Sequence, residues 1–434
     1  MEAERLGRVE EELVAFHAGF APLFGRREAQ ERSEQYLRGL LVQKEERRSA
    51  ENLAEAVEGA NARALQRFLS ESGWDDAALI ERVQGYLGQR LSDAAGVFIL
   101  DETGFPKQGK KSVGVARMYT GTLGKRANCQ IGVFLSYTSP KGHATVDRRL
   151  YLPEQWTDDP ARCRAAGVPE GVTFQTKPQL GLSMLRQARA WGHLAGQWVT
   201  GDEVYGNSTP LRDALRQEGW SYVLEVSCDT PVFLQKPRLE IPPHRGRGRV
   251  PQKPRRVAGE PAPCTVAEVA AGLEESAWTL LKVAEGSQGP RIYRFAHVRL
   301  WESRGGLPGP ETWLLLRTNP DGSELKYYLS NAPRSATLER LGEVAALRWT
   351  VEVEFEFLKG EAGLDEYEVR SWRGWHHHTA LVLLAEAFLL TLEQAWGEKA
   401  APDHARAGRL RGPAPPAAPS LEHRGPARLA PANR

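Results

Sequence analysis

The 434-residue chain has few cysteines and a formal net charge close to zero. Its four cysteines lie far apart without a Cys-x-x-Cys pair, which argues against both a disulfide framework and a zinc ribbon. No stretch approaches 18 uninterrupted apolar residues, so we expect no membrane span. The formal net charge is only +2, so any affinity for nucleic acid has to come from local patches.

Apolar residues, by contrast, are plentiful enough for sizeable cores. They make up 41% of a chain that is too long for one ordinary domain, so we expect two or three domains. Met1 to Arg5 begin a charged helix and do not resemble a signal peptide. The chain is therefore expected to be cytoplasmic.

The first region, residues 1–92, is predicted to be helical. Apolar residues such as Leu13, Phe16 and Phe20, and further on Leu37 and Leu41, recur at helical spacings. The charges between them are mixed in sign. The pattern indicates a small helical bundle, which either binds a partner or packs against the next domain.

The next region has the pattern of an α/β core with a mixed sheet, which residues 93–228 begin and residues 336–398 complete. Strands are predicted at 97–100, 129–137, 144–152, 197–201 and 220–226, with helices at 178–191 and 211–217. A β-rich insertion, residues 229–335, interrupts it with strands at 278–283, 292–300, 312–318 and 327–329. A long helix is predicted from about 336 and an apolar helix at 378–396. The tail, 399–434, is rich in Pro, Ala, Gly and Arg and is predicted to be disordered.

Three carboxylates stand out against this framework. Asp101 and Asp202 each end an apolar run, and Glu352 lies in a helical segment. A carboxylate at the end of a buried strand is an unusual place for a purely structural charge. Two divalent cations held by such groups can activate a nucleophile and stabilise the leaving oxygen of a phosphodiester. Because no His or Cys is among the candidates, the ligand set favours Mg²⁺ or Mn²⁺.

The helix around Glu352 also has a plainer interpretation. Arg348, Glu352, Glu356 and Lys359 share one face, opposite an apolar stripe, so they can be a solvated face with i,i+4 ion pairs. Glu356 is the best substitute if Glu352 is not the third ligand. Rival acids also follow the other two carboxylates, as Glu102 and Glu203. Since side chains alternate along a strand, only one of each pair can face a common site.

Basic residues supply candidate DNA contacts. Lys107 and Lys110 follow Asp101 in a glycine-rich loop, where they either bind phosphates or are solvated loop charges. Arg247 and Arg249 lie in a proline-rich basic run whose DNA affinity would be salt-sensitive. The adjacent histidines 376–378 point in different directions on a helix, which argues against a joint metal site.

Four segments together carry a resemblance to a known family. They are Leu100–Gly109 (LDETGFPKQG), Val199–Gly206 (VTGDEVYG), Arg348–Trp372, and Glu46–Ala54 (ERRSAENLA). The chain resembles bacterial insertion-sequence transposases of the DDE type. This resemblance implies an RNase H-like mixed-sheet core with a β-rich insertion, preceded by an α-helical DNA-binding domain.

The same resemblance implies roles for individual residues. Asp101, Asp202 and Glu352 would be catalytic and would bind two Mg²⁺ (or Mn²⁺) ions, while Arg348 and Lys359 would contact phosphates near the transposon end. The hairpin-forming branch of the family carries a Tyr-x2-Arg-x3-Glu-x6-Lys pattern. This chain matches its last three positions but has Ala345 at the Tyr position, which puts one contact to the DNA end in doubt.

The partners implied are double-stranded DNA, as transposon ends and as target, and a second copy of the chain in a DNA-bound homodimer. The expected reaction is cleavage at the terminal inverted repeats and joining of the freed ends to target DNA. Two alternatives stay open. One is a DNA-binding derivative without transposition activity, and the other is a structure-specific nuclease of the same fold.

Overall fold

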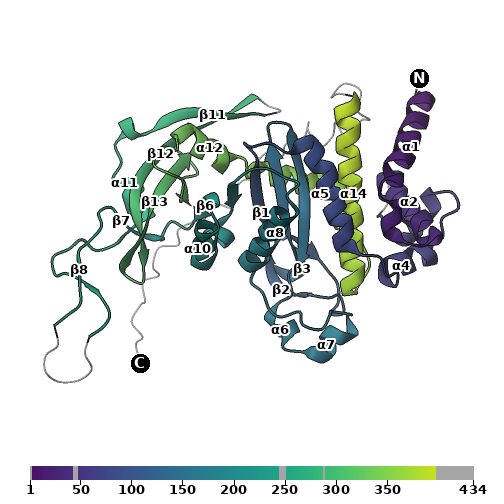
Figure 1. Cartoon of the computed structure of the whole chain (residues 1–434), viewed down its shortest axis with the longest axis horizontal. Coiled ribbons are helices and arrows are strands. Elements are labelled where there is room, and N and C mark those ends of the chain that lie inside the picture. The colour runs from purple at the N-terminus through teal and green to yellow at the C-terminus, as the bar shows by residue number, and fades with distance from the viewer. Residues whose placement is uncertain (1, 43–46, 244–250, 287–288, 397–434) are drawn as a thin grey trace, which may run out of the picture.

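The computed structural model describes residues 2–42, 47–243, 251–286 and 289–396. Figure 1 shows helices of the N-terminal region at one end of the molecule, a sheet with packed helices in the middle and the strands of the insertion at the other end. Arg247, Arg249 and the tail predicted to be disordered, 399–434, lie outside the described residues.

The N-terminal region is helical, as its apolar spacing predicts. The α-helices are α1 (Glu2–Ala18), α2 (Arg27–Val42), α3 (Ala50–Ala56), α4 (Ala62–Ser70) and α5 (Asp76–Leu91). Arg48, which is buried, joins this region to the rest of the protein. Its guanidinium donates to the carbonyl oxygens of Gly360 and Glu361, both at 3.0 Å, and pairs with Glu366 at 3.2 Å. The helical region is therefore anchored on the segment that follows Glu352.

The core is a mixed sheet. Its strands are β1 (Val97–Pro106), β2 (Ala116–Thr120), β3 (Lys125–Ser139), β4 (Gly142–Leu150), β5 (Trp198–Gly201) and β6 (Ser221–Val226). β3 is antiparallel to β1 and also pairs with β2 and β4, whereas β1, β5 and β6 are mutually parallel neighbours. This order confirms the predicted α/β class with an RNase H-like mixed sheet.

The strands of the insertion extend the same sheet beyond β6. They are β7 (Pro231–Phe233), β10 (Cys264–Thr265), β11 (Thr279–Gly286), β12 (Gly289–Arg304), β13 (Leu307–Thr318) and β14 (Lys326–Ser330). β14 pairs antiparallel with β6, and β13, β12 and β7 follow in order (Figure 1). β8 (Leu239–Glu240) and β9 (Arg255–Arg256) form a separate two-stranded ribbon. The backbone of the core and that of the insertion are thus hydrogen-bonded into one sheet.

Helices cover both faces of the core sheet. α8 (Lys177–Trp191) packs on the face of β1 that carries Leu100, where Gly181 meets the Leu100 side chain, and α10 (Thr209–Gln217) lies beside it. α13 (Trp349–Ala362) covers the other face, where Phe355 packs on Phe134 of β3. α14 (Trp372–Trp396) lies against α5 and β4 (Figure 1). By length and composition α14 is apolar enough to cross a membrane, but 67% of its apolar window is buried inside the protein, as in a core helix.

Two elements differ from their prediction. The long helix expected from about residue 336 is divided into α12 (Leu338–Ala346) and α13 by a turn at Leu347 and Arg348. Apolar periodicity continues across this turn, so it gives no local signal of the break. β1 also runs past its apolar part to Pro106, because β3 pairs with it along that whole length. Asp101 consequently lies within a strand and not at its end, contrary to the prediction.

Candidate active site

Three neighbouring parallel strands each carry a carboxylate at the same level. Leu100 of β1 pairs with Gly201 of β5, which pairs with Leu224 of β6, so the residues that follow them are level across the sheet. These residues are Asp101, Asp202 and Glu225. In parallel strands that are in register, side chains at the same level point to the same face of the sheet. The three carboxylates therefore line one side of the candidate site.

Arg348 connects this row to α13, the helix that carries Glu352. Its guanidinium donates to Oδ2 of Asp101 at 3.1 Å and to Oε1 of Glu352 at 2.7 Å, and its Nε lies 3.8 Å from Oε2 of Glu225. The turn between α12 and α13 places Arg348 in this position. The structure thus brings Asp101, Glu352 and Glu225 around one guanidinium.

The site carries more negative charge than Arg348 neutralises. Burial raises the pKa of Asp101 to about 7; Arg348 opposes this rise, and the charges of Asp202 and Glu102 add to it. Burial and then the charge of Glu102 raise the pKa of Asp202 to about 6. Burial alone would lower the pKa of Arg348, but the carboxylates around it outweigh burial and raise it. Such an uncompensated cluster favours the arrival of further positive charge.

Asp202 has a second, local role. It is the N-cap of α9 (Glu203–Gly206), where its Oδ1 accepts from the backbone N–H of Val204 at 2.9 Å. One carboxylate oxygen is therefore tied to the backbone, which fixes the orientation of the group. The other oxygen is left to face the neighbouring charges.

The rival acids lie apart from this cluster or at its rim. Glu102 points to the opposite face of β1, where it pairs with Lys177 and accepts from the Tyr205 hydroxyl at 3.1 Å. Glu356 is exposed and has its pKa raised by burial and by the charge of Glu352. Glu352 is itself 60% exposed at its side chain, but it is the acid that Arg348 holds. Of the two acids on this helix face, Glu352 is thus the one connected to Asp101.

The predicted phosphate contacts fall into two groups. Arg348 and Lys359 flank Asp101, and the Lys359 ammonium donates to Oγ1 of Thr103 at 2.8 Å, two residues along β1 from Asp101. Lys107 is packed over the Tyr367 ring at 3.5 Å, and burial lowers its pKa to about 8. Lys110 is on the surface. The structure therefore places Arg348 and Lys359 beside the carboxylates and Lys107 in a more enclosed position.

Carboxylate oxygens are the ligands that hard divalent cations prefer, although these carboxylates do not converge on one point in the structure. Within the described residues, no group of three or more His, Cys, Asp or Glu side chains is spaced to hold a metal ion. The guanidinium of Arg348 lies between Asp101 and Glu352 and takes the place of a cation there. An all-oxygen set with surplus negative charge suits Mg²⁺ or Mn²⁺ better than Zn²⁺.

Glu225 was missed by the sequence reasoning. Its Oε1 accepts from the Lys326 ammonium at 2.8 Å, whereas its buried Oε2 makes no hydrogen bond within the described structure. The signal was present in the sequence, since Glu225 is the only charge in the strand Ser221–Val226 (SYVLEV). In the structure this lone acid has two cationic neighbours, Lys326 at 2.8 Å and Arg348 at 3.8 Å.

The three adjacent histidines have separate partners. His376 bonds to the carbonyl of Trp372 at 2.9 Å, His377 to that of Trp74 at 3.2 Å and His378 to the Tyr36 hydroxyl at 2.8 Å. Burial lowers the pKa of all three, to about 3 for the first and third and about 4 for His377. His377 and His378 therefore connect α14 to the N-terminal region, whereas the His376 ring bonds within α14.

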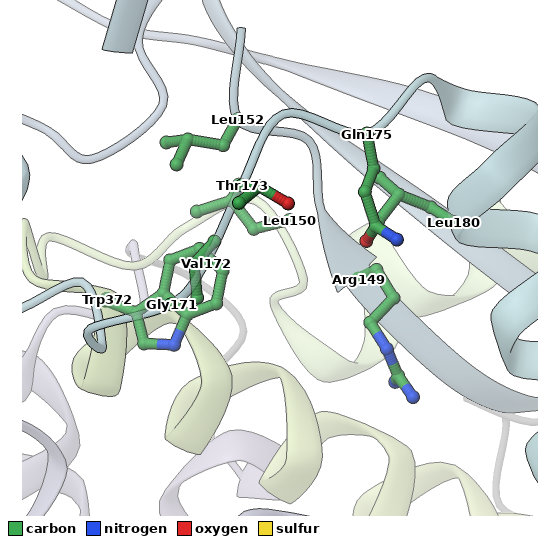
Figure 2. A pocket seen from close by; sticks show the side chains of 9 residues that line it. All are labelled: Arg149, Leu150, Leu152, Gly171, Val172, Thr173, Gln175, Leu180 and Trp372. Atoms are coloured by element: carbon green, nitrogen blue, oxygen red, sulfur yellow. The ribbon is translucent and has the colours of Figure 1, made fainter. Parts of the chain in front are cut away.

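A cavity of about 310 Å³ lies elsewhere, at the end of β4. Figure 2 shows Arg149 and Gln175 on one side of it and Trp372 on the other. The lining is mostly apolar and consists of Arg149, Leu150, Leu152, Gly171, Val172, Thr173, Gln175, Leu180 and Trp372. Arg149 already pairs with Asp147 at 2.6 Å, and none of the three catalytic candidates lines the cavity.

Comparison with known proteins places the chain in a class. Residues 19–290 match the family model described as DDE superfamily endonuclease. This match covers more than half of the chain, so the protein belongs to the DDE superfamily endonucleases and is an enzyme of that class. It includes Asp101 and Asp202 and ends before Glu352.

The chain is also similar in sequence to one named transposase. A probable transposase for the insertion sequence element IS701, from Microchaete diplosiphon, is 29% identical over 167 residues. That match covers 37% of this chain and 40% of the relative. Among solved structures, the NurA nuclease from Sulfolobus solfataricus aligns over 62% of this chain and 82% of its own, at 10% identity and a TM-score of 0.25, which is too low to indicate a shared fold.

Proposed function

We propose that this protein is an insertion-sequence transposase that cleaves DNA at the ends of its element and joins those ends to target DNA. One observation carries the proposal: Asp101 and Asp202 are level on adjacent strands, and Arg348 connects Asp101 to Glu352. The membership of the DDE superfamily endonucleases and the likeness to a probable IS701 transposase support it.

In this proposal Asp101, Asp202 and Glu352 hold two Mg²⁺ or Mn²⁺ ions. When bound, such ions supply a nucleophilic oxygen and stabilise the charge that develops on the leaving oxygen. Asp202 is oriented for this by its bond to the Val204 N–H, and Asp101 by the rigid backbone of β1. Arg348 and Lys359 bind the phosphates on either side of the scissile bond, with Lys107 and Lys110 further along the strand.

Arg348 then exchanges partners during binding. In the structure it neutralises the carboxylates, and in the DNA complex its guanidinium turns to a phosphate oxygen. Carboxylate and phosphate oxygens both accept from the guanidinium N–H groups, so the same side chain can bind either partner. Arg348 stabilises the carboxylate cluster in the structure and would be free to bind DNA if another positive charge took its place.

The remaining parts of the chain receive roles by analogy with the family. Residues 1–92 and part of the insertion, 229–335, bind the terminal inverted repeats, and the catalytic core is residues 93–228 and 336–398. Arg247 and Arg249 of the insertion contact DNA. Two copies act on the two ends as a homodimer in the cytoplasm, close to the nucleoid.

Ala345 at the Tyr position is the sequence feature that favours the alternative, a DNA-binding derivative without transposition activity. Ala345 is 2% exposed and packs inside α12, so its small side chain is fitted into the core. The contact that a tyrosine makes in the hairpin-forming branch is therefore absent, while the carboxylates are unaffected.

The test is a cleavage assay with a matched control. DNA that carries the gene's flanking sequence is incubated with the protein and Mg²⁺, and nicked, hairpin and strand-transfer products are separated on gels. We expect products from the wild type and none from Asp101→Asn. Asp213→Asn, which removes an exposed acid paired with Arg304, is the control and should cleave normally. Tight end-binding without cleavage under any divalent metal would refute the enzyme, and cleavage without strand transfer would favour a nuclease.

A further inference from the structure

A stretch of sequence rich in basic residues begins after the Asp101–Glu102 pair. From Thr103 to Val146 the sequence contains seven lysines and arginines and no aspartate or glutamate, in a chain whose net charge is only +2. The middle of this stretch is the β2–β3 hairpin, formed by Ala116–Thr120, a turn of 3-10 helix at Gly121–Leu123 and the start of β3. The charge asymmetry marks this hairpin as a surface for an anionic partner.

The hairpin is joined to the active site. Thr122, in its turn, donates to the carbonyl of Gly104 at 3.1 Å. Lys359 of the catalytic helix donates to Oγ1 of Thr103 at 2.8 Å and lies 3.4 Å from Oγ1 of Thr122. One lysine thus contacts both the strand that carries Asp101 and the turn of the hairpin, so a chain of phosphates that leaves the carboxylates past Lys359 meets the hairpin next.

The register shows which hairpin residues share the face of Asp101. Asp101 pairs with Phe134 of β3, and alternation along β3 places Asn128 and Arg126 on that same face. Their partners on β2 are Arg117 and Tyr119.

These hairpin side chains face solvent. Tyr119 is 63% exposed, and Arg117 and Arg126 are exposed on either side of it. The Arg126 guanidinium donates to the backbone carbonyl of Arg117 at 3.3 Å, which holds it beside β2. In the described part of the sheet β2 is an edge strand, so one edge of the hairpin has no strand beside it.

We propose that the β2–β3 hairpin is a platform for single-stranded DNA, on which the strand leaving the active site is held with one base stacked on Tyr119. This deepens the proposed function and rests on it. Exposed aromatic rings between arginines are the usual means of binding an unpaired strand, since the cations follow the phosphates and every base has a face to stack. At 63% exposure the Tyr119 ring leaves a face open on which a base can stack.

The test measures binding to labelled 20-nucleotide single strands and to the blunt duplex of the same sequence, by fluorescence anisotropy in EDTA so that no cleavage occurs. Tyr119→Ala should bind the single strand roughly 5- to 150-fold more weakly, the range for loss of one stacked base, and the duplex within twofold of the wild type. Tyr119→Trp should keep full affinity. Leu234→Ala, which shortens an apolar side chain that is 51% exposed in the insertion, is the control and should change neither.

Salt dependence separates the stacking ring from the cations. For single strands, the steepness of log K against log salt concentration is about 0.7 for each phosphate that the protein neutralises. Arg126→Gln should therefore flatten the slope by about 0.7, whereas Tyr119→Ala should lower the affinity at every salt concentration without changing the slope. A 2-aminopurine base in the strand should report stacking by quenching that Tyr119→Ala abolishes.

The outcomes distinguish this inference from the function on which it rests. If Tyr119→Ala binds single strands as the wild type does, or weakens duplex binding equally, the platform is refuted even though the wild type cleaves DNA. If the wild type cleaves no DNA with any divalent metal but shows the Tyr119-dependent preference for single strands, the transposase proposal fails and the platform stands.

Discussion

The Arg348 guanidinium donates to the Asp101 carboxylate at 3.1 Å, across the gap between the catalytic helix and the central strand. The same guanidinium holds Glu352 at 2.7 Å, so one side chain connects two of the three proposed metal ligands. A buried carboxylate that lacked such a partner would be costly in the folded protein. Arg348 therefore acts as an internal counter-ion for the carboxylates that we propose as metal ligands.

The first prediction concerns the stability of the acid cluster. The folded pKa of Asp101, about 7, is above the value of about 3.9 expected in the unfolded chain. The folded state thus holds this proton more tightly, and the contribution of Asp101 to the unfolding free energy falls as pH rises from about 4 to 7. In EDTA, Asp101→Asn should raise Tm at pH 8, by roughly 1 °C for each kcal/mol of the burial cost that is relieved in a chain of this length.

At pH 5 that difference should vanish, because the wild-type Asp101 is then protonated. Asp213→Asn is the control and should show no such pH dependence. A lower Tm for Asp101→Asn at pH 8 would mean that the pairing with Arg348 outweighs the cost of burial, and the prediction would be wrong.

The second prediction concerns metal affinity. Metal binding requires ionised carboxylates, so it displaces the protons that Asp101 and Asp202 retain up to about pH 7 and 6. Binding of Mn²⁺, followed by electron paramagnetic resonance, should weaken steeply as the pH falls from 7.5 to 5.5, by about tenfold per unit for each proton displaced. Constant affinity across this range would show that the two acids are not ligands.

The third prediction assigns Glu225 a positioning role through Arg348. Glu225→Gln keeps the acceptor for Lys326 but removes the charge near the Arg348 Nε. The arginine should become less well ordered, and cleavage should slow by about 10- to 100-fold, as for other groups that orient ligands. Because the charge of Glu225 helps to raise the pKa of Asp202, the acid limb of the pH–rate profile should also move to lower pH.

Glu343→Gln, which alters an exposed acid on α12, is the matched control for this variant. A slower reaction with an unchanged pH profile would indicate a purely structural effect and contradict the positioning role.

The fourth prediction concerns the attachment of the N-terminal helices. Arg48→Met removes the buried guanidinium that bonds the carbonyls of Gly360 and Glu361. It also removes the charged partner of Glu366, which keeps only the backbone N–H of residue 48 at 2.8 Å. We expect the unfolding free energy to fall by about 3–5 kcal/mol in urea titration at pH 7. Arg67→Met, whose arginine forms an exposed pair with Glu71, should cost less than about 1 kcal/mol. Equal losses in the two variants would show that the buried contacts add nothing.

Much of the fold follows from local pattern. The helices of residues 1–92, the apolar start of β1 and the strands of the insertion carry their periodicity in the sequence, because burial on one face imposes a period of 3.6 or 2. The break between α12 and α13 has no such signal in the sequence, because Val344, Leu347 and Val351 keep the helical spacing across it. The turn at Leu347 and Arg348 is instead selected by packing, which orients α12 on the insertion and α13 on the core sheet.

Local sequence is enough to identify which side chains are candidates for chemistry. Acids next to apolar runs, such as Asp101 and Asp202, are conspicuous because burying an unpaired charge costs folding free energy. Which of these acids meet depends on the tertiary fold. The register of β1, β5 and β6 aligns Asp101, Asp202 and Glu225, and the turn before α13 brings Arg348 among them. Strand register and helix breaks depend on contacts between residues far apart in the chain, and a local pattern contains no record of those contacts.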